Sequence, residues 1–138
     1  MSVHISPDLQ AQLDAAEYVW LTTVRDDGQP QPTPVWFIQE NDTFLIYSSP
    51  NAQKVRNIQA NPKVALNYNP EPDAENFIVI MGDAVIDEDA PSPIHNGAFF
   101  KKYEQGIETI GMTPDSYEQT FSLAIRVTPT RVRGNSGE

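Results

Sequence analysis

A chain of 138 residues, of which 39% are hydrophobic, is long enough to bury one core and too short for two domains. Its formal charge of -10, from 19 acidic and 9 basic residues, excludes nucleic acids and anionic membranes as partners held by long-range attraction. The sequence has no cysteine, which excludes disulfides, thiolate metal sites and cysteine nucleophiles.

The sequence carries no segment typical of membrane insertion or export. No apolar run approaches the roughly 18 residues of a transmembrane helix. Residues 1–5, MSVHI, lack the basic and then apolar order of an export signal. We therefore expect a cytoplasmic protein.

The predicted elements begin with a short helix and a β-hairpin. Ser6 and Pro7 are typical of an N-cap and a first-turn proline, and apolar residues follow at helical spacing. Residues 18–24 are rich in β-formers, residues 26–28 (DDG) are typical of a turn, and residues 33–39 form a second apolar run.

Three prolines, Pro30, Pro32 and Pro34, alternate along the second predicted strand. In an extended chain their missing N–H groups all face the same side. We therefore expect one edge of this strand to lack a regular ladder and to lie open to solvent, another chain or a ligand.

The next predicted elements are a strand and a helix. Residues 40–42 (END) form a turn into a third strand at residues 43–49. Residues 49–51 (SPN) are typical of a helix start, and Asn61-Pro62 ends a helix of about ten residues.

The second half of the chain continues this alternation. Its pattern predicts strands at 64–68 and 77–87, a helix with apolar residues at helical spacing between 99 and 110, a helix start at Thr113-Pro114, and a last strand at 121–133. Pro129 interrupts the alternation of that last strand. Six strands with short turns and intervening helices predict an α+β, mainly β fold, a partly open antiparallel barrel formed by residues 1–138 as one domain.

A candidate anion site lies where the third strand meets the following helix. Tyr47, Ser48 and Ser49 bring hydroxyl groups, and Lys54 and Arg56 bring positive charge. Free N–H groups and the positive end of a helix dipole favour an anion such as a phosphate. Alternatively, the two cations are solvated helix residues and the serines only cap the helix.

A second candidate is the strand that contains Thr33, Pro34, Val35, Trp36 and Phe37. Its edge groups can hydrogen-bond a flat heterocycle such as a flavin pyrimidine, and Trp36 offers a π face. The alternative is structural: Val35 and Phe37 lie in the core, and Trp36 belongs to the barrel or to an interface.

Other functional classes lack their residues. His4 and His95 have no metal-ligand spacing around them, so neither a metal site nor a histidine-based triad is predicted. No GxGxxG or P-loop motif occurs, which excludes the Rossmann and ATP-binding patterns. Arg126, Arg131 and Arg133 either reach an anionic ligand or pair with surface acids. No catalytic side chain is predicted, and a bound flavin requires orientation from the protein more than such a residue.

Three segments resemble the pyridoxamine 5′-phosphate oxidase-like superfamily of FMN-binding split β-barrels: VWLTTVRDDGQP at 19–30, TPVWF at 33–37 and KVRNI at 54–58. Two later segments, IGMTP at 110–114 and IRVTPTRVRG at 125–134, resemble the subfamily of oxidoreductases that depend on the deazaflavin coenzyme F420. The resemblance covers nearly the whole chain. It implies a six-stranded antiparallel split β-barrel with short flanking helices.

The resemblance also implies a homodimer with two cofactor sites at its interface, each lined by both chains. By motif position, it assigns cofactor binding to the backbone of Thr33, Pro34 and Val35 at the pyrimidine edge, to Tyr47, Ser48, Ser49 and Lys54 at the ribityl chain and phosphate, and to Arg56 as a further candidate.

Two positions depart from the pattern. Pyridoxamine phosphate oxidases have an arginine where this chain has Gln53, which argues against oxidation of pyridoxamine phosphate itself. Similar members of the F420 subfamily end the last motif with a tryptophan where this chain has Asn135, which removes the basis for a terminal aromatic contact.

The sequence therefore predicts an oxidoreductase that transfers a hydride between F420 or FMN and a small organic substrate. The two later segments favour F420, whereas FMN shares its ring, ribityl chain and first phosphate. Convergence of Lys54, Arg56, Arg131 and Arg133 would favour the longer, carboxylate-bearing tail of F420. The alternative hypothesis is a non-catalytic flavin-binding or carrier protein of the same fold.

Overall fold

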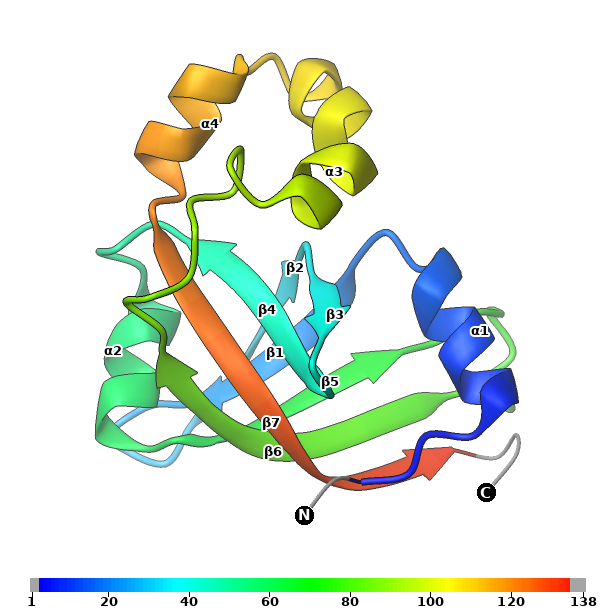
Figure 1. Cartoon of the computed structure of the whole chain (residues 1–138). Coiled ribbons are helices and arrows are strands. Elements are labelled where there is room, and N and C mark those ends of the chain that lie inside the picture. Colours follow the sequence, from blue (N-terminus) through cyan, green and yellow to red (C-terminus); the bar gives the residue numbers. More distant parts are fainter. Residues whose placement is uncertain (1–2, 135–138) are drawn as a thin grey trace.

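A computed structural model describes residues 3–134 as an antiparallel sheet curled around a core and flanked by helices (Figure 1). The helices are α1 (Pro7–Ala15), α2 (Gln53–Ala60), α3 (Gly97–Thr109) and α4 (Pro114–Thr120). The strands are β1 (Val19–Val24), β2 (Pro30–Val35), β3 (Ile38–Glu40), β4 (Thr43–Ser48), β5 (Lys63–Tyr68), β6 (Ile78–Ile86) and β7 (Leu123–Gly134). The predicted α+β barrel is confirmed, with seven strands in place of the expected six.

Two helices between residues 3 and 134 start at the predicted capping residues, Ser6 and Thr113, and Asn96 caps α3 without having been predicted. The Ser6 hydroxyl accepts a hydrogen bond from the Leu9 N–H (3.3 Å), and the Asn96 side chain accepts one from the Phe99 N–H (3.2 Å). Thr113 and Ser116 form a reciprocal capping box at α4. Each cap satisfies a backbone donor that the first helical turn leaves unpaired.

The extra strand arises because the predicted run 33–39 divides in two. β2 pairs with β1, whereas β3 pairs with β4. The strand order β2-β1-β5-β6-β7-β4-β3 places β2 and β3 at opposite edges of the sheet. Since Trp36 and Phe37 alone separate these two edges along the chain, the sheet must curl until its edges lie close together. The barrel is therefore split between β2 and β3.

The longest strand, β7, joins the two halves of the sheet by pairing with β6 and β4. It continues through Pro129, so the predicted interruption does not end the strand. The register shifts between Met81 and Gly82, which face Arg131 and Pro129, and the extra residue forms a bulge that tolerates proline. A Cβ atom on Gly82 would lie 2.5 Å from the Thr128 carbonyl oxygen, so this close approach requires glycine.

Two hydrophobic clusters share the interior. The barrel cluster combines strand residues with Leu9 and Leu13 of α1 and Val55 and Ile58 of α2. The second cluster lies beneath α3 and α4, which sit together at one end of the barrel and are called the helical cap below (Figure 1). None of the helices between residues 3 and 134 has the length and apolarity needed to cross a membrane.

The corner at Trp36 and Phe37 is pinned by Tyr103 of the cap. The Tyr103 hydroxyl accepts a hydrogen bond from the Phe37 N–H (2.9 Å) and donates one to the Glu17 carbonyl (2.6 Å). Phe37 lies between β2 and β3 and takes part in the strand pairing of neither, and it is only 1% exposed. Its backbone donor thus depends on a side chain 66 residues away.

We expect Tyr103→Phe to lower the free energy of unfolding by about 1–3 kcal/mol, because it leaves the buried Phe37 N–H without an acceptor while the aromatic ring is kept. Urea denaturation followed by circular dichroism measures the change. The matched control is Tyr68→Phe, because the Tyr68 hydroxyl makes no hydrogen bond with any residue between 3 and 134, and it should change stability by less than about 0.5 kcal/mol. Equal effects of the two variants would contradict the proposed role of the hydroxyl.

Candidate functional site

Predicted site residues from three separate segments meet beside the split. A pocket of about 170 Å³ is lined by Pro34 and Val35 of β2 and the adjoining Trp36, by Tyr47 of β4 and by Lys54 of α2. The helical cap completes it with Ile110, Tyr117 and Phe121. The structure therefore brings together two segments that the sequence offered as separate candidates, the β2 strand and the β4–α2 junction.

Lys54 supplies a half-buried positive charge to this pocket. Its ammonium forms neither an ion pair nor a hydrogen bond with any residue between 3 and 134. Burial lowers the pKa of Lys54 because desolvation penalises its charged form. An anionic ligand in the pocket would offset that penalty.

The start of α2 also differs from the sequence prediction. The helix begins at Gln53 with Ala52 as its N-cap, so no side chain caps the first N–H groups. The predicted start at residues 49–51 was two to four residues early. Ser48 is fully buried and its hydroxyl donates to the Ser49 carbonyl (2.9 Å), which leaves Ser49 as the half-buried hydroxyl at this turn.

Arg56 is exposed and its guanidinium turns back toward the helix start. It donates to the Asn51 carbonyl (2.8 Å) and to the Gln53 side-chain oxygen (2.6 Å). Arg56 therefore stabilises the loop before α2, and it does not line the Lys54 pocket. Thr33 lies one residue outside that pocket, on the side of β2 that pairs with β1.

Asn57 fixes α2 against the first hairpin, a role that the sequence analysis missed. Its side-chain N–H groups donate to the Thr23 hydroxyl (2.9 Å) and to the Gln31 side-chain oxygen (3.0 Å). The side-chain oxygen of Asn57 accepts a hydrogen bond from the side-chain amide of Gln53 (2.8 Å). Asn57 is 1% exposed, so these bonds are made in a low-dielectric setting and position the helix that carries Lys54.

The outer edge of β2 is open, as the proline spacing predicts. Within residues 3–134, β2 pairs with β1 alone. Because Pro30, Pro32 and Pro34 lack N–H groups, the ladder uses Gln31, Thr33 and Val35, and the proline carbonyls point away from β1. This edge therefore presents hydrogen-bond acceptors and no donors over residues 30–34, which suits a ligand with an N–H group.

Trp36 uses its rings against the cap. It stacks on Tyr103 with ring centroids 4.5 Å apart and planes 3° apart, and on Tyr117 with centroids 5.5 Å apart and planes 17° apart. The indole is half-buried and borders three pockets. Its structural role is thus plain, while its edges remain available to ligands on either side.

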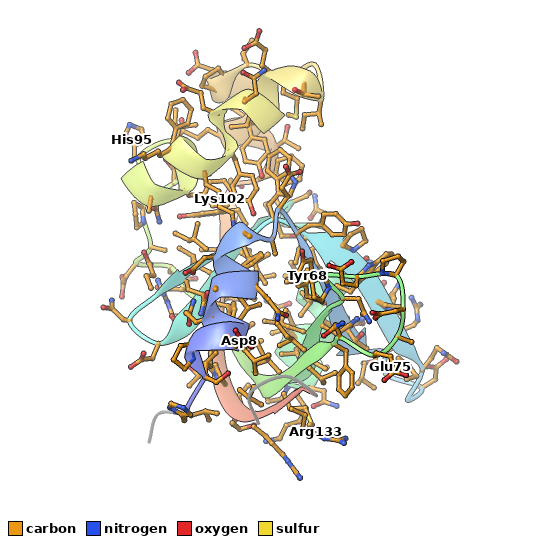
Figure 2. The ribbon with its side chains drawn as sticks, turned by 90° about the vertical axis from the view of Figure 1, so that its right-hand side faces the viewer. Asp8, Tyr68, Glu75, His95, Lys102 and Arg133 are labelled. Atoms are coloured by element: carbon orange, nitrogen blue, oxygen red, sulfur yellow. The ribbon has the colours of Figure 1, made fainter. Side chains whose placement is uncertain are left out.

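The arginines of β7 do not join Lys54 within one chain. Arg126 pairs with Asp87 (2.8 Å) and Glu40 (3.0 Å), and the Asp87 carboxyl has its pKa lowered by this hydrogen bond. Arg131 and Arg133 are exposed, and Arg133 lies at the end of the barrel opposite the cap (Figure 2). Asn135, the second departure from the family pattern, lies outside the described residues.

His95 lies in a polar cluster that the sequence analysis did not predict. Its ring nitrogen Nδ1 is 2.7 Å from the Ser92 hydroxyl and 3.0 Å from the Glu118 carboxylate, and the Ser92 hydroxyl also donates to Glu118. A catalytic triad needs the serine and the acid on different ring nitrogens. This arrangement joins the loop before α3 to α4, and no metal-binding group of histidine and acidic side chains occurs between residues 3 and 134.

The chain belongs to the pyridoxamine 5′-phosphate oxidase family, whose sequence pattern matches residues 5–135. Its fold is the split β-barrel of that family. No curated protein is significantly similar to the chain in sequence.

Solved structures extend this comparison. An F420 reductase is 29% identical, with a TM-score of 0.69, and the match covers 90% of this chain and 94% of that one. A proposed pyridoxamine 5′-phosphate oxidase of Listeria innocua is 22% identical, with a TM-score of 0.69 and coverage of 94% and 97%. HutZ, a haem storage protein of Vibrio cholerae, is 19% identical, with a TM-score of 0.65 and coverage of 97% and 95%.

We expect Asn57→Ala to destabilise the protein by about 1–3 kcal/mol, because the buried Thr23 hydroxyl and the side chains of Gln31 and Gln53 lose their partner. Amide hydrogen exchange should also become faster throughout α2, since the helix loses its tie to the hairpin. Gln59→Ala, at an exposed position on the same helix, is the control. Unchanged exchange in α2 of the Asn57 variant would show that packing of Val55 and Ile58 alone holds the helix.

Proposed function

We propose that the protein is an oxidoreductase that holds F420 or FMN at the split of the barrel and reduces or oxidises a small organic substrate. The observation that carries this proposal is the unpaired Lys54 ammonium, which lines one pocket together with residues of the open β2 edge. Family membership and the similarity to an F420 reductase support the choice of cofactor class.

The residues present fit such a cofactor at both ends. The acceptor edge formed by the carbonyls of Pro32 and Pro34 suits the N–H group of a flavin or deazaflavin pyrimidine ring. Lys54, the uncapped N–H groups at the start of α2 and the Ser49 hydroxyl suit a phosphate group. When bound, F420 or FMN supplies the hydride chemistry that no side chain of this protein provides.

The pocket of one chain is too small for the whole cofactor, which supports a homodimer. Next to it, a shallow pocket of about 340 Å³ is lined by Tyr18, Trp20 and residues 34–36. Tyr18 and Trp20 are 48% and 41% exposed, which is unusual for large aromatic side chains next to an unpaired strand edge. A second copy that covers this face would enclose the cofactor and add its own residues to the site.

The choice between F420 and FMN depends on the tail. F420 carries carboxylates beyond the phosphate, and a protein of charge -10 needs a local group of cations to hold them. Arg131 and Arg133 lie away from Lys54 in one chain, so this function would fall to the arginines of a second copy. The sequence segments at 110–114 and 125–134 and the 29% identity to an F420 reductase favour F420.

The second candidate is a carrier of the same cofactor without turnover. HutZ, a haem storage protein, shares the fold. A panel of conjugated carbonyl compounds separates the two, because an enzyme oxidises its reduced cofactor in the presence of one of them and a carrier does not.

Native mass spectrometry of the full chain with added F420 and FMN tests the proposal. We expect a dimer that binds two cofactors, with F420 retained in preference to FMN. Paired titrations at low and high salt should show a larger loss of affinity for F420, because its carboxylate tail depends on screened charges. Preference for FMN at both salt concentrations would overturn the choice of F420, and a monomer without either cofactor would overturn the proposal.

Lys54→Ala should weaken cofactor binding by about 10- to 100-fold, since a charge-assisted contact contributes about 1.5–3 kcal/mol. Isothermal titration calorimetry measures the change, and the melting temperature reports whether the fold is intact. Lys101→Ala removes an exposed lysine of α3 and serves as the charge-matched control. Equal affinities of the two variants would refute the assignment of Lys54.

A further inference from the structure

A second pocket, of about 470 Å³, lies on the other side of Trp36 and contains none of the predicted cofactor residues except Trp36 itself. It runs between α3 and the segment before β1, and its lining includes Glu17, Lys102 and Gly106. We call it the α3 groove. It shares Trp36 and Ile110 with the Lys54 pocket, so ligands in the two pockets would be neighbours across the indole.

Lys102 provides a charged hydrogen-bond donor to the α3 groove. Figure 2 shows it on α3 where the cap meets the barrel. Its ammonium donates to the Phe37 carbonyl (3.0 Å) and lies 3.9 Å from the centroid of the Phe37 ring. An ammonium has three N–H groups, so two remain for a ligand once the carbonyl is satisfied. Partial burial lowers its pKa to about 8, which leaves it mostly protonated at neutral pH.

The remainder of the groove combines polar side chains, Gln105 and Thr109, with an apolar wall. A Cβ atom on Gly106 would lie 3.1 Å from the Trp36 ring, so glycine allows the indole edge to form part of the floor. Ile110 borders the groove and is 53% exposed, which is high for a large aliphatic side chain. A planar organic molecule would cover both surfaces.

The charges around Lys102 decide which polar group such a molecule carries. Asp14 and Glu17 both raise the pKa of Lys102, so two carboxylates act on one ammonium. Neither forms an ion pair with Lys102 within the described part of the chain. A carboxylate ligand would add a third negative charge, whereas an uncharged carbonyl accepts the same hydrogen bond without that repulsion.

We propose that the α3 groove binds a small, planar, uncharged carbonyl compound, whose oxygen accepts a hydrogen bond from Lys102 and whose apolar body lies on Trp36 and Ile110. Its role as the substrate site rests on the proposed function. Lys102 then positions the carbonyl and withdraws electron density from it, which favours acceptance of a hydride where the ligand reaches past the indole edge beside Ile110, a side chain that lines both pockets.

The test uses two probes of the same shape: benzylideneacetone, which is uncharged, and cinnamate, which carries a carboxylate. The chain has two tryptophans, so its indole N–H signals in a proton–nitrogen NMR spectrum can be assigned by single substitution. Benzylideneacetone should shift the Trp36 indole and the Gly106 amide and leave the Trp20 indole unchanged, because Trp20 lines the pocket on the other side. Cinnamate should bind more weakly by about threefold or more.

Two variants complete the test. Lys102→Met keeps most of the length of the side chain without its ammonium and should weaken benzylideneacetone binding by about tenfold. Lys101→Met removes the neighbouring exposed lysine and should leave binding unchanged. The shifts measured on the unmodified chain remain decisive even if Lys102→Met fails to fold.

The outcomes separate this inference from the proposed function. Shifts at Trp20, tighter binding of cinnamate, no binding of either probe, or equal binding to Lys102→Met and Lys101→Met would overturn the inference. None of these measurements requires a cofactor. If F420 and FMN fail to bind while the probe binds at Trp36 and depends on Lys102, the groove assignment stands and the oxidoreductase proposal fails.

Discussion

The site depends on the two-residue step between β2 and β3. Trp36 and Phe37 join strands at opposite edges of one sheet, so the sheet must curl, yet Phe37 leaves both ladders and loses its backbone partners. Tyr103 and Lys102 of the cap supply those partners. Without them, a buried N–H and a buried C=O would remain unpaired, at a cost of about 1–3 kcal/mol each.

This solution explains why the candidate pockets gather around Trp36. The corner cannot pair as a strand, so the cap must approach it closely, and the stacked rings of Trp36, Tyr103 and Tyr117 fill the contact. This packing leaves a pocket on either side of the indole. The pockets that contain Lys54 and Lys102 therefore follow from the same packing that closes the barrel.

The sequence predicts those features that depend on neighbouring residues. The caps at Ser6 and Thr113 and the open edge at Pro30 to Pro34 are local, and the structure confirms them. The division of run 33–39 could not be predicted, because alternation continues through a corner that only long-range pairing reveals.

The same limit applies to the site. Lys54 and residues 34–36 carry recognisable local chemistry, and the pocket unites them. Asn57, Tyr103, Lys102 and Tyr117 were missed as functional positions, since their partners lie more than 30 residues away or on another element. Conversely, Arg56 was predicted to bind the cofactor because of its charge, but its guanidinium donates hydrogen bonds to Asn51 and Gln53.

The two half-buried lysines show how an acidic protein can sort ligands by charge. Desolvation alone shifts the pKa of Lys54, with no carboxylate acting on it, so an anion there would meet an uncompensated positive charge. Asp14 and Glu17 already act on Lys102, so a ligand anion, the third negative charge there, gains little. One indole thus separates a place for a phosphate from a place for an uncharged carbonyl. Because electrostatic selection at each place depends on whether carboxylates lie close to the lysine, the overall charge of -10 does not prevent binding of an anionic cofactor at Lys54.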